Sequence, residues 1–341
     1  MLPTRTSERV VLPPKLRKGF PSDPFLGFCV VRLLAWTILA GALIDSGWAQ
    51  DLAPRAYLIT PLHTNVINLT YSFFNGGLDF NGVVPIAGAT GTYSVPSISY
   101  YHSFSLFGRS ANIAAGLPYG IGTFEGSVLG TNTQIYRSGL SDLGIRFSVN
   151  LKGGPAMPIS QFVKWKQKTV LGISLKVIPP TGQYDHKELI NWGINRWAFK
   201  PELGYSKRMG KWWLDGYGGV WFFTTNQKFY SIPAPQPQTQ NPIGSLEGHL
   251  SYDAKEFPGK GTPLWFSLDG NFWYGGRTTL GGVSNPDTTQ TSSRVGFTAA
   301  FPLSRHNSIK TSFSTAAYVR YGGDYQNLSV SWQYSWLGKP N

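Results

Sequence analysis

The sequence predicts an all-β protein, a transmembrane antiparallel up-and-down β-barrel of about 12 strands that follows a cleaved signal peptide. Three observations predict it: period-two alternation of apolar and polar residues after residue 51, an export signal, and a composition with 40 glycines, 15% aromatic and only 14% charged residues. Alternation gives a strand one apolar and one polar face. In a closed barrel these faces meet lipid and line a lumen. A soluble β-sandwich also alternates, but it needs fewer aromatic residues and glycines.

The export signal is an apolar core at residues 33–44, preceded by Arg32. This core is too short for a transmembrane helix and has the length of a signal-peptide core. Gly47 and Ala49 occupy the −3 and −1 positions of a cleavage site before Gln50. We therefore expect residues 1–49 to be a signal peptide and residues 50–341 to form the barrel. The basic stretch before residue 25 is longer than the start of most signal peptides, and if translation begins near Val31, Arg32 supplies the positive charge of the signal.

The mature chain contains no cysteine, because Cys29 lies in the signal, so disulfides and thiolate metal sites are excluded. Its net charge is +10, from 24 basic and 14 acidic residues that are dispersed among the strands. This pattern favours basic residues in a lumen and at lipid-facing rims over nucleic-acid binding. The five histidines show no metal-ligand spacing, and adjacent His102 and Ser103 point to opposite faces. We expect no enzyme, no cofactor and no metal.

Alternation and turn residues predict the individual strands. Short connections at 108, 209–211 and 302–306 alternate with long ones at 75–94, 120–140, 179–195, 224–242 and 276–290, as they do when one barrel end faces the periplasm. Two connections break this rhythm: 152–167 should be short but contains a predicted helix capped by Ser160, and 319–325 should be long but is brief. The twelve predicted strands are 64–74, 95–107, 109–119, 141–151, 168–178, 196–207, 212–223, 243–253, 263–275, 291–301, 307–318 and 326–336.

The last strand alternates strictly from Leu328 to Trp336, with serine or glutamine between apolar residues. A final strand of this kind is a signal for the outer-membrane assembly machinery, and the aromatic clusters at strand ends predict interfacial girdles. On this register Phe147 and Trp332 face lipid, whereas Arg146 and Gln333 face the lumen.

Five stretches are spread over nearly the whole mature chain: residues 51–57, 163–169, 180–185, 195–204 and 273–279. They resemble a bacterial outer-membrane transporter family, the phenol-degradation meta-pathway (MetA-pathway) proteins. It implies an outer-membrane barrel that transports small molecules. Fold does not fix the substrate.

Charged residues on predicted lumen faces are the candidate site. Arg196, Lys200 and Glu202 share one face, spaced over about 20 Å at ~3.3 Å per residue. Two interpretations are open: a charged row that selects permeants, or a structural ion-pair network that fills the barrel. The other lumen candidates are Arg146, Asp215 as a facing partner, Asp269 and Asn271, and the loop or lid candidates are Tyr184, Asp185 and Arg277.

The sequence thus predicts an outer-membrane channel for passive or facilitated passage of small, hydrophobic or aromatic solutes. Its partners are membrane lipid, the assembly machinery and the solute. The alternative is a structural or adhesive barrel that acts through its long loops. A barrel-embedded lipid hydrolase would need a serine and a histidine facing the same side of neighbouring strands.

Overall fold

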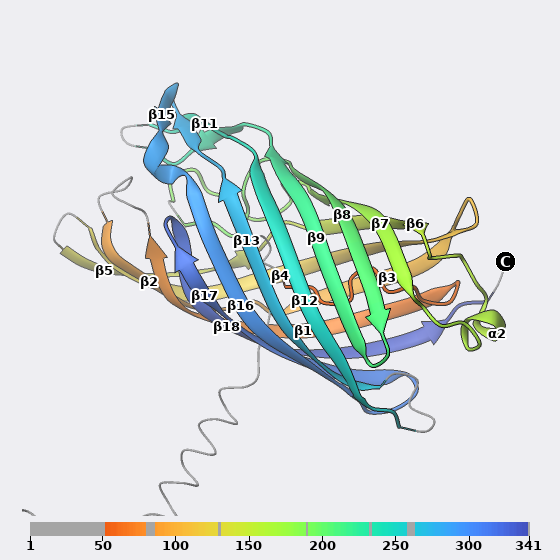
Figure 1. The fold of residues 1–341 in the computed structure, drawn as a ribbon. Coiled ribbons are helices and arrows are strands. Elements are labelled where there is room, and N and C mark those ends of the chain that lie inside the picture. Colours follow the sequence, from red (N-terminus) through yellow and green to blue (C-terminus); the bar gives the residue numbers. More distant parts are fainter. Residues whose placement is uncertain are drawn as a thin grey trace, which may run out of the picture. The chain divides into compact units, whose positions relative to one another are not determined.

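The structure, a computed structural model, describes residues 52–79, 86–128, 131–188, 190–231, 234–257 and 263–339. The predicted signal peptide lies outside the described residues and stays a prediction. Among the residues described, no helix is long and apolar enough to cross a membrane. The described part of the chain is nearly all β, and most of its strands form one closed antiparallel barrel (Figure 1).

The first half of the barrel consists of long strands and two pairs of shorter ones. β2 and β3 both pair with β1, and β5 and β6 both pair with β4, so each pair acts as one interrupted strand of the wall. The break between β2 and β3 falls at Val95-Pro96, where proline cannot donate to a ladder. The bounds are β1 Thr64–Asp79, β2 Ile86–Ser94, β3 Ser97–Leu106, β4 Arg109–Val128, β5 Thr131–Leu140, β6 Gly144–Lys152 and β7 Thr169–Ile178.

The second half is a regular meander, and its last strand closes the barrel. β18 pairs with β1 along its whole length, from Thr64 opposite Leu337 to Asp79 opposite Gly322. Counting each interrupted pair once, the wall has twelve strands, and all twelve predicted strands are confirmed. The bounds are β8 Ala198–Met209, β9 Trp212–Phe223, β12 Ile243–Lys255, β13 Leu264–Gly275, β16 Gln290–Pro302, β17 Asn307–Val319 and β18 Gly322–Leu337.

Several predicted loops are wrong, because they contain strands. Segments 75–94 and 120–140 extend β1 and β4 and add β2 and β5. Glycine suggested turns there, yet a Cβ at Gly120 or Gly122 would overlap Trp192 or Tyr93, so these glycines make room for aromatic rings on a strand. Segments 224–242 and 276–290 hold a small sheet of β10 Asn226–Phe229, β11 Gln236–Gln240, β14 Thr278–Leu280 and β15 Val283–Asn285, followed by the 3-10 turn η1 Pro286–Thr288.

We call the end that carries these connections the loop end, and the opposite end, where Thr64 meets Leu337, the turn end. Figure 1 shows β11 and β15 at the loop end and the short helix α2 Ile159–Phe162 at the other. The predicted helix is confirmed, but Ser160 is not its cap: Pro158 is, and no side chain caps it. Short turns mark the periplasmic end of outer-membrane barrels.

The two faces of the wall differ as predicted. Large apolar side chains stand exposed on the outside, including Phe147 and Trp332 at 36% and 38% exposure. Lumen faces carry small polar residues, and Ser72, Ser103, Ser206 and Ser329 are at most 1% exposed. An exposed apolar belt around a closed barrel is the surface of a membrane barrel.

Candidate functional site

An ion-pair network joins β8 to β12 on the lumen face of the wall. Lys200 Nζ on β8 lies 2.7 Å from Glu202 Oε2 and 2.7 Å from Glu247 Oε1 on β12. The lysine reaches β12 across β9, where Gly219 has no side chain; a Cβ there would lie 2.9 Å from Lys200 Cε. All three side chains are 9% exposed, so each charge depends on its partners.

The segment before β1, residues 52–63, lies inside the lumen on the turn-end side of this network. We call it the plug segment. Arg55 Nη2 lies 2.7 Å from Asp253 Oδ1, and the guanidinium lies 4.3 Å from the ring centroid of Trp265. The Arg55 backbone N–H donates to Asp215 at 3.1 Å. The plug segment is therefore anchored on the lumen faces of β9, β12 and β13.

Tyr57 is the second anchor of the plug segment. It is 1% exposed, and its hydroxyl donates to Glu202 at 3.0 Å and lies 3.0 Å from Ser174 Oγ. Gly172 and Gly204 lie opposite each other on β7 and β8. A Cβ at either position would overlap the Tyr57 ring, so these glycines form the niche for it.

A cavity of about 390 Å³ lies on the loop-end side of the network. We call it the chamber. Its aromatic rings come from five wall strands and one loop. Phe74 stacks on Tyr93 with the ring centroids 4.6 Å apart, and Trp192 from the loop between β7 and β8 meets Tyr93 edge-on at 5.8 Å. Glu247 and Asn271 also line the chamber. The aromatic residues that line the chamber are Phe74, Tyr93, Trp192, Trp221, Phe223, Phe272, Trp273 and Tyr325.

Arg196 places a cation in this aromatic chamber. Its guanidinium lies 4.7 Å from the Phe223 ring centroid, and Nη2 donates to Gln240. Nε and Nη1 are buried and have no hydrogen-bond partner among the described residues. Burial lowers the pKa of Arg196 to about 10, so the side chain is charged at neutral pH. A solute with an acceptor atom would satisfy these two nitrogens.

The structure separates the row of charges read from the sequence. Lys200 and Glu202 join the network, while Arg196 belongs to the chamber above them. Arg146 lies 3.5 Å from Glu202 and stacks over Tyr57, so it links the network to the plug segment. Asp215 was predicted to face the row of Arg196, Lys200 and Glu202. Instead, its Oδ2 accepts a hydrogen bond from the backbone N–H of Arg55.

The remaining predicted residues fall in three places. Asn271 lines the chamber. Asp269 does not: it is buried, and its Oδ1 lies 2.8 Å from Nδ1 of His249 on the neighbouring strand β12. Tyr184 donates to the Lys228 carbonyl at 2.9 Å, which ties its loop to the β10 region, and burial raises its pKa. Asp185 accepts from the Lys187 N–H within its own loop, and Arg277 is exposed at the loop end. Neither Asp185 nor Arg277 lines the chamber.

Sequence reasoning missed Glu247, the plug anchors and the convergence of the aromatic rings. Glu247 alternates with apolar Leu246 on β12, a lumen-face signal that was present in the sequence. The plug segment shows no regular alternation of apolar and polar residues, so its sequence does not mark it as lying inside the lumen. Within the described part of the chain, no group of His, Cys, Asp and Glu is arranged to hold a metal ion.

The model of the family described as "Putative MetA-pathway of phenol degradation" matches residues 78–332. Among solved structures, an outer membrane channel from Pseudomonas putida F1 is similar at a TM-score of 0.65 and 17% identity, over 84% of this chain and 100% of that one. Two autotransporter domains score lower. The AIDA-I transport unit from Escherichia coli has a TM-score of 0.48 and 10% identity, over 90% and 97% of the two chains. The Bordetella BrkA β domain has 0.46 and 11%, over 80% and 100%.

No curated protein matches the chain. At 17% identity the channel from Pseudomonas putida F1 shows the fold alone, that of an outer-membrane β-barrel. The family match is broader evidence, because it covers the wall from the end of β1 into β18. The chain is an outer-membrane barrel that belongs to the MetA-pathway phenol-degradation family.

Proposed function

We propose that the protein is a passive outer-membrane channel for small solutes that combine an apolar, aromatic body with one hydrogen-bond acceptor. The observation that carries the proposal is the chamber, where aromatic rings surround a buried arginine with two nitrogens that lack partners among the described residues. Pockets for small molecules are largely apolar, have volumes of roughly 300–1,000 Å³ and hold a few placed polar groups. The chamber has this construction.

The family and fold support transport as the purpose of this chamber. A phenol-like solute could stack on Trp221 or Trp273 while its oxygen accepts from Arg196. The network and the plug segment lie between the chamber and the turn end, so water and ions meet buried charges along the axis. This arrangement favours apolar solutes over a wide aqueous flow. Transport of this kind needs no cofactor.

Binding of 4-bromophenol to the refolded barrel tests the proposal. Heavy-atom quenching of the chamber tryptophans should saturate, and Arg196→Gln should weaken binding roughly 10- to 100-fold, because a hydrogen bond to a charged group is worth about 1.5–3 kcal/mol. Arg277→Gln is the matched control, since this arginine is exposed at the loop end outside the chamber. Unsaturable quenching, or equal affinity in the wild type and Arg196→Gln, would count against the chamber as the binding site.

An adhesive barrel is the second candidate, and the small sheet β10-β11-β14-β15 favours it, because folded loops can present a surface. Uptake separates the two. Cells that carry the protein in the outer membrane should admit N-phenyl-1-naphthylamine, an apolar dye that fluoresces in lipid, faster than cells without it. Equal rates would favour the adhesive barrel.

A further inference from the structure

The exposed charges of the barrel are distributed unevenly between its two ends. The connections and C-terminal tail at the turn end, with the three nearest residues of each strand, carry ten exposed lysines and arginines among the described residues. Glu256 is the one exposed carboxylate described there. The described part of the loop end carries four exposed side chains of each sign. The turn end therefore has a positive rim, which attracts anions.

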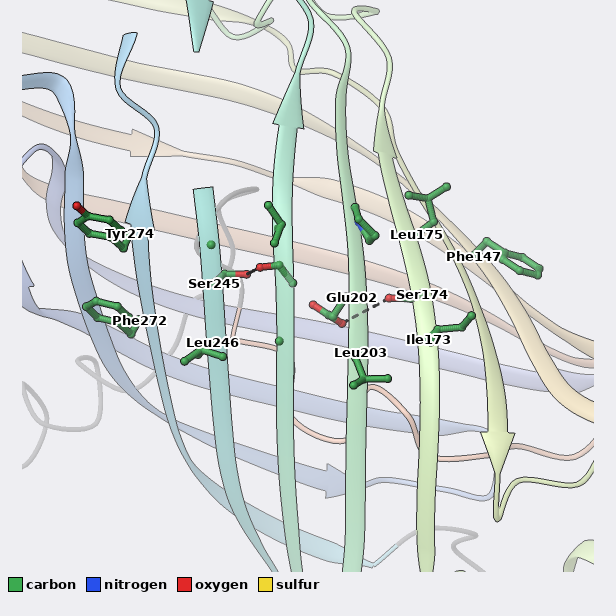
Figure 2. Close-up of a pocket in the computed structure, with 15 residues that line it drawn as sticks. Phe147, Ile173, Ser174, Leu175, Glu202, Leu203, Ser245, Leu246, Phe272 and Tyr274 are labelled. Atoms are coloured by element: carbon green, nitrogen blue, oxygen red, sulfur yellow. Dashed lines mark hydrogen bonds between the residues drawn. The ribbon is translucent and has the colours of Figure 1, made fainter. Parts of the chain in front are cut away.

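Lys207 brings this positive charge onto the lipid-facing wall. It is exposed and continues the outward row of β8 that includes Leu203 and Tyr205. Figure 2 shows Leu203 among the apolar side chains of the outer face. The outward neighbours of Lys207 are Tyr205 and Met209 on its own strand and Leu214 opposite it on β9, and they are 39%, 42% and 43% exposed. The stem of Lys207 therefore lies in the apolar belt.

The ammonium group of Lys207 has no protein partner. Its neighbour Arg208 lies 3.9 Å from Asp253, whereas the Lys207 side chain forms no ion pair or hydrogen bond with any described residue. A cation on the lipid face of a barrel is least costly near the interface. Lysine can reach that interface by extending its methylene stem along an apolar surface. The ammonium group is therefore free to bind a lipid headgroup.

Two aromatic rings mark the interface close to Lys207. Trp212 of β9 and Tyr252 of β12 are paired across the wall, with ring centroids 4.7 Å apart. Trp212 lies opposite Met209, two residues nearer the turn end than Lys207. Such rings favour the headgroup level of a bilayer. Two strand residues span ~6.6 Å, a distance that the four-carbon stem of lysine can nearly cover.

Two more exposed lysines lie beside the same end of β8. Lys211 belongs to the two-residue turn between β8 and β9. Lys168 directly precedes β7, and its carbonyl accepts the Arg208 N–H at 2.7 Å. We call Lys168, Lys207 and Lys211 the lysine patch. None of the three side chains forms an ion pair with a described carboxylate.

We propose that the lysine patch binds the headgroup of an anionic phospholipid in the periplasmic leaflet. Such a lipid provides both parts that the patch requires: acyl chains for the apolar belt around Lys207, and a net negative headgroup for three cations. A zwitterionic phospholipid has no net charge to offer. An acidic soluble partner could reach Lys168 and Lys211, but Lys207 lies on the lipid-facing wall. The proposal is independent of the chamber and of what the channel transports.

Native mass spectrometry of the refolded barrel tests the patch, in titrations with palmitoyl-oleoyl-phosphatidylglycerol and with the matching phosphatidylcholine. A basic residue near an anionic lipid surface strengthens binding roughly fivefold. We therefore expect the wild type to prefer phosphatidylglycerol. Replacing all three lysines of the patch by glutamine should weaken phosphatidylglycerol binding roughly 100-fold and leave phosphatidylcholine binding unchanged.

A matched control removes the same charge from the other end. The variant Lys187→Gln, Lys228→Gln, Arg277→Gln loses three exposed cations of the loop end and should bind both lipids as the wild type does. Lys207→Arg keeps the charge and should keep the preference. Heat-modifiable migration in gels shows that each variant is folded before its lipid binding is compared.

Three results would overturn the proposal. Equal binding of the two lipids by the wild type, or an unchanged preference in the triple glutamine variant, would mean that the patch does not recognise anionic lipid. Displacement of phosphatidylglycerol by excess inorganic phosphate would make the patch a site for soluble anions. Unaltered phosphatidylglycerol binding by Lys207→Gln alone would leave only the lysines that an acidic soluble partner can reach.

Discussion

Removing the Arg55 side chain should release the plug segment. Arg55→Ala breaks a buried ion pair in which both side chains are less than 10% exposed. Removing one partner of such a pair costs about 3–5 kcal/mol. Asp253 keeps the Trp213 Nε1 hydrogen bond at 2.8 Å, so we expect the lower figure, about 3 kcal/mol. At 1.4 kcal/mol per decade, the released state should become roughly 100-fold more populated.

Single-channel recording in planar bilayers measures this population as the fraction of time spent in the larger conductance state. Arg208→Ala is the matched control, because Arg208 lies 3.9 Å from the same Asp253 with a more exposed side chain. Its loss should cost less than about 1 kcal/mol and change the open fraction less than about fivefold. An Arg55→Ala channel with the wild-type open fraction and wild-type thermal stability would refute the anchoring role of this ion pair.

Three further predictions follow from the same geometry. Gly204→Val should expel Tyr57 and raise conductance, whereas Gly216→Val, with open space around its Cβ, should not; equal conductances would show that the niche does not hold the plug. Phe147→Arg should cost ~2–4 kcal/mol near the bilayer midplane and impair heat-modifiable folding far more than Arg146→Ala, and equal assembly would mean the register is misread. Lys200→Ala leaves Glu202 and Glu247 without their shared cation and should shift reversal potentials toward cations; an unchanged potential with a less stable barrel would make the network purely structural.

The strands of the barrel wall could be predicted because the alternation that marks each strand lies within that strand's own sequence. Alternation in strands such as Gly144–Lys152 assigns each side chain to a face without knowledge of its partners. Glycine-rich strand extensions were missed because glycine marks both turns and close packing. The rings over Gly120 and Gly122 come from Trp192 and Tyr93, which are distant in the sequence.

The plug segment could not be predicted from its own residues. Arg55 and Tyr57 meet partners 198 and 145 residues away, so no local pattern records these contacts. One indirect signal existed: Gly172 and Gly204 are lumen-facing glycines on adjacent strands. Glycine inside a strand often marks the close approach of another group.

The most direct test of the account is a crystal structure of the wild-type protein soaked with 4-bromophenol and recorded at the bromine absorption edge. The account predicts an anomalous peak in the chamber, beside Trp221 and Trp273, with the phenol oxygen within hydrogen-bond distance of Arg196 Nε or Nη1. The same soak of Arg196→Gln should weaken the peak. An empty chamber in the wild type, with bromine bound only on the outer surface or nowhere, would contradict the claim that this lumen binds aromatic solutes.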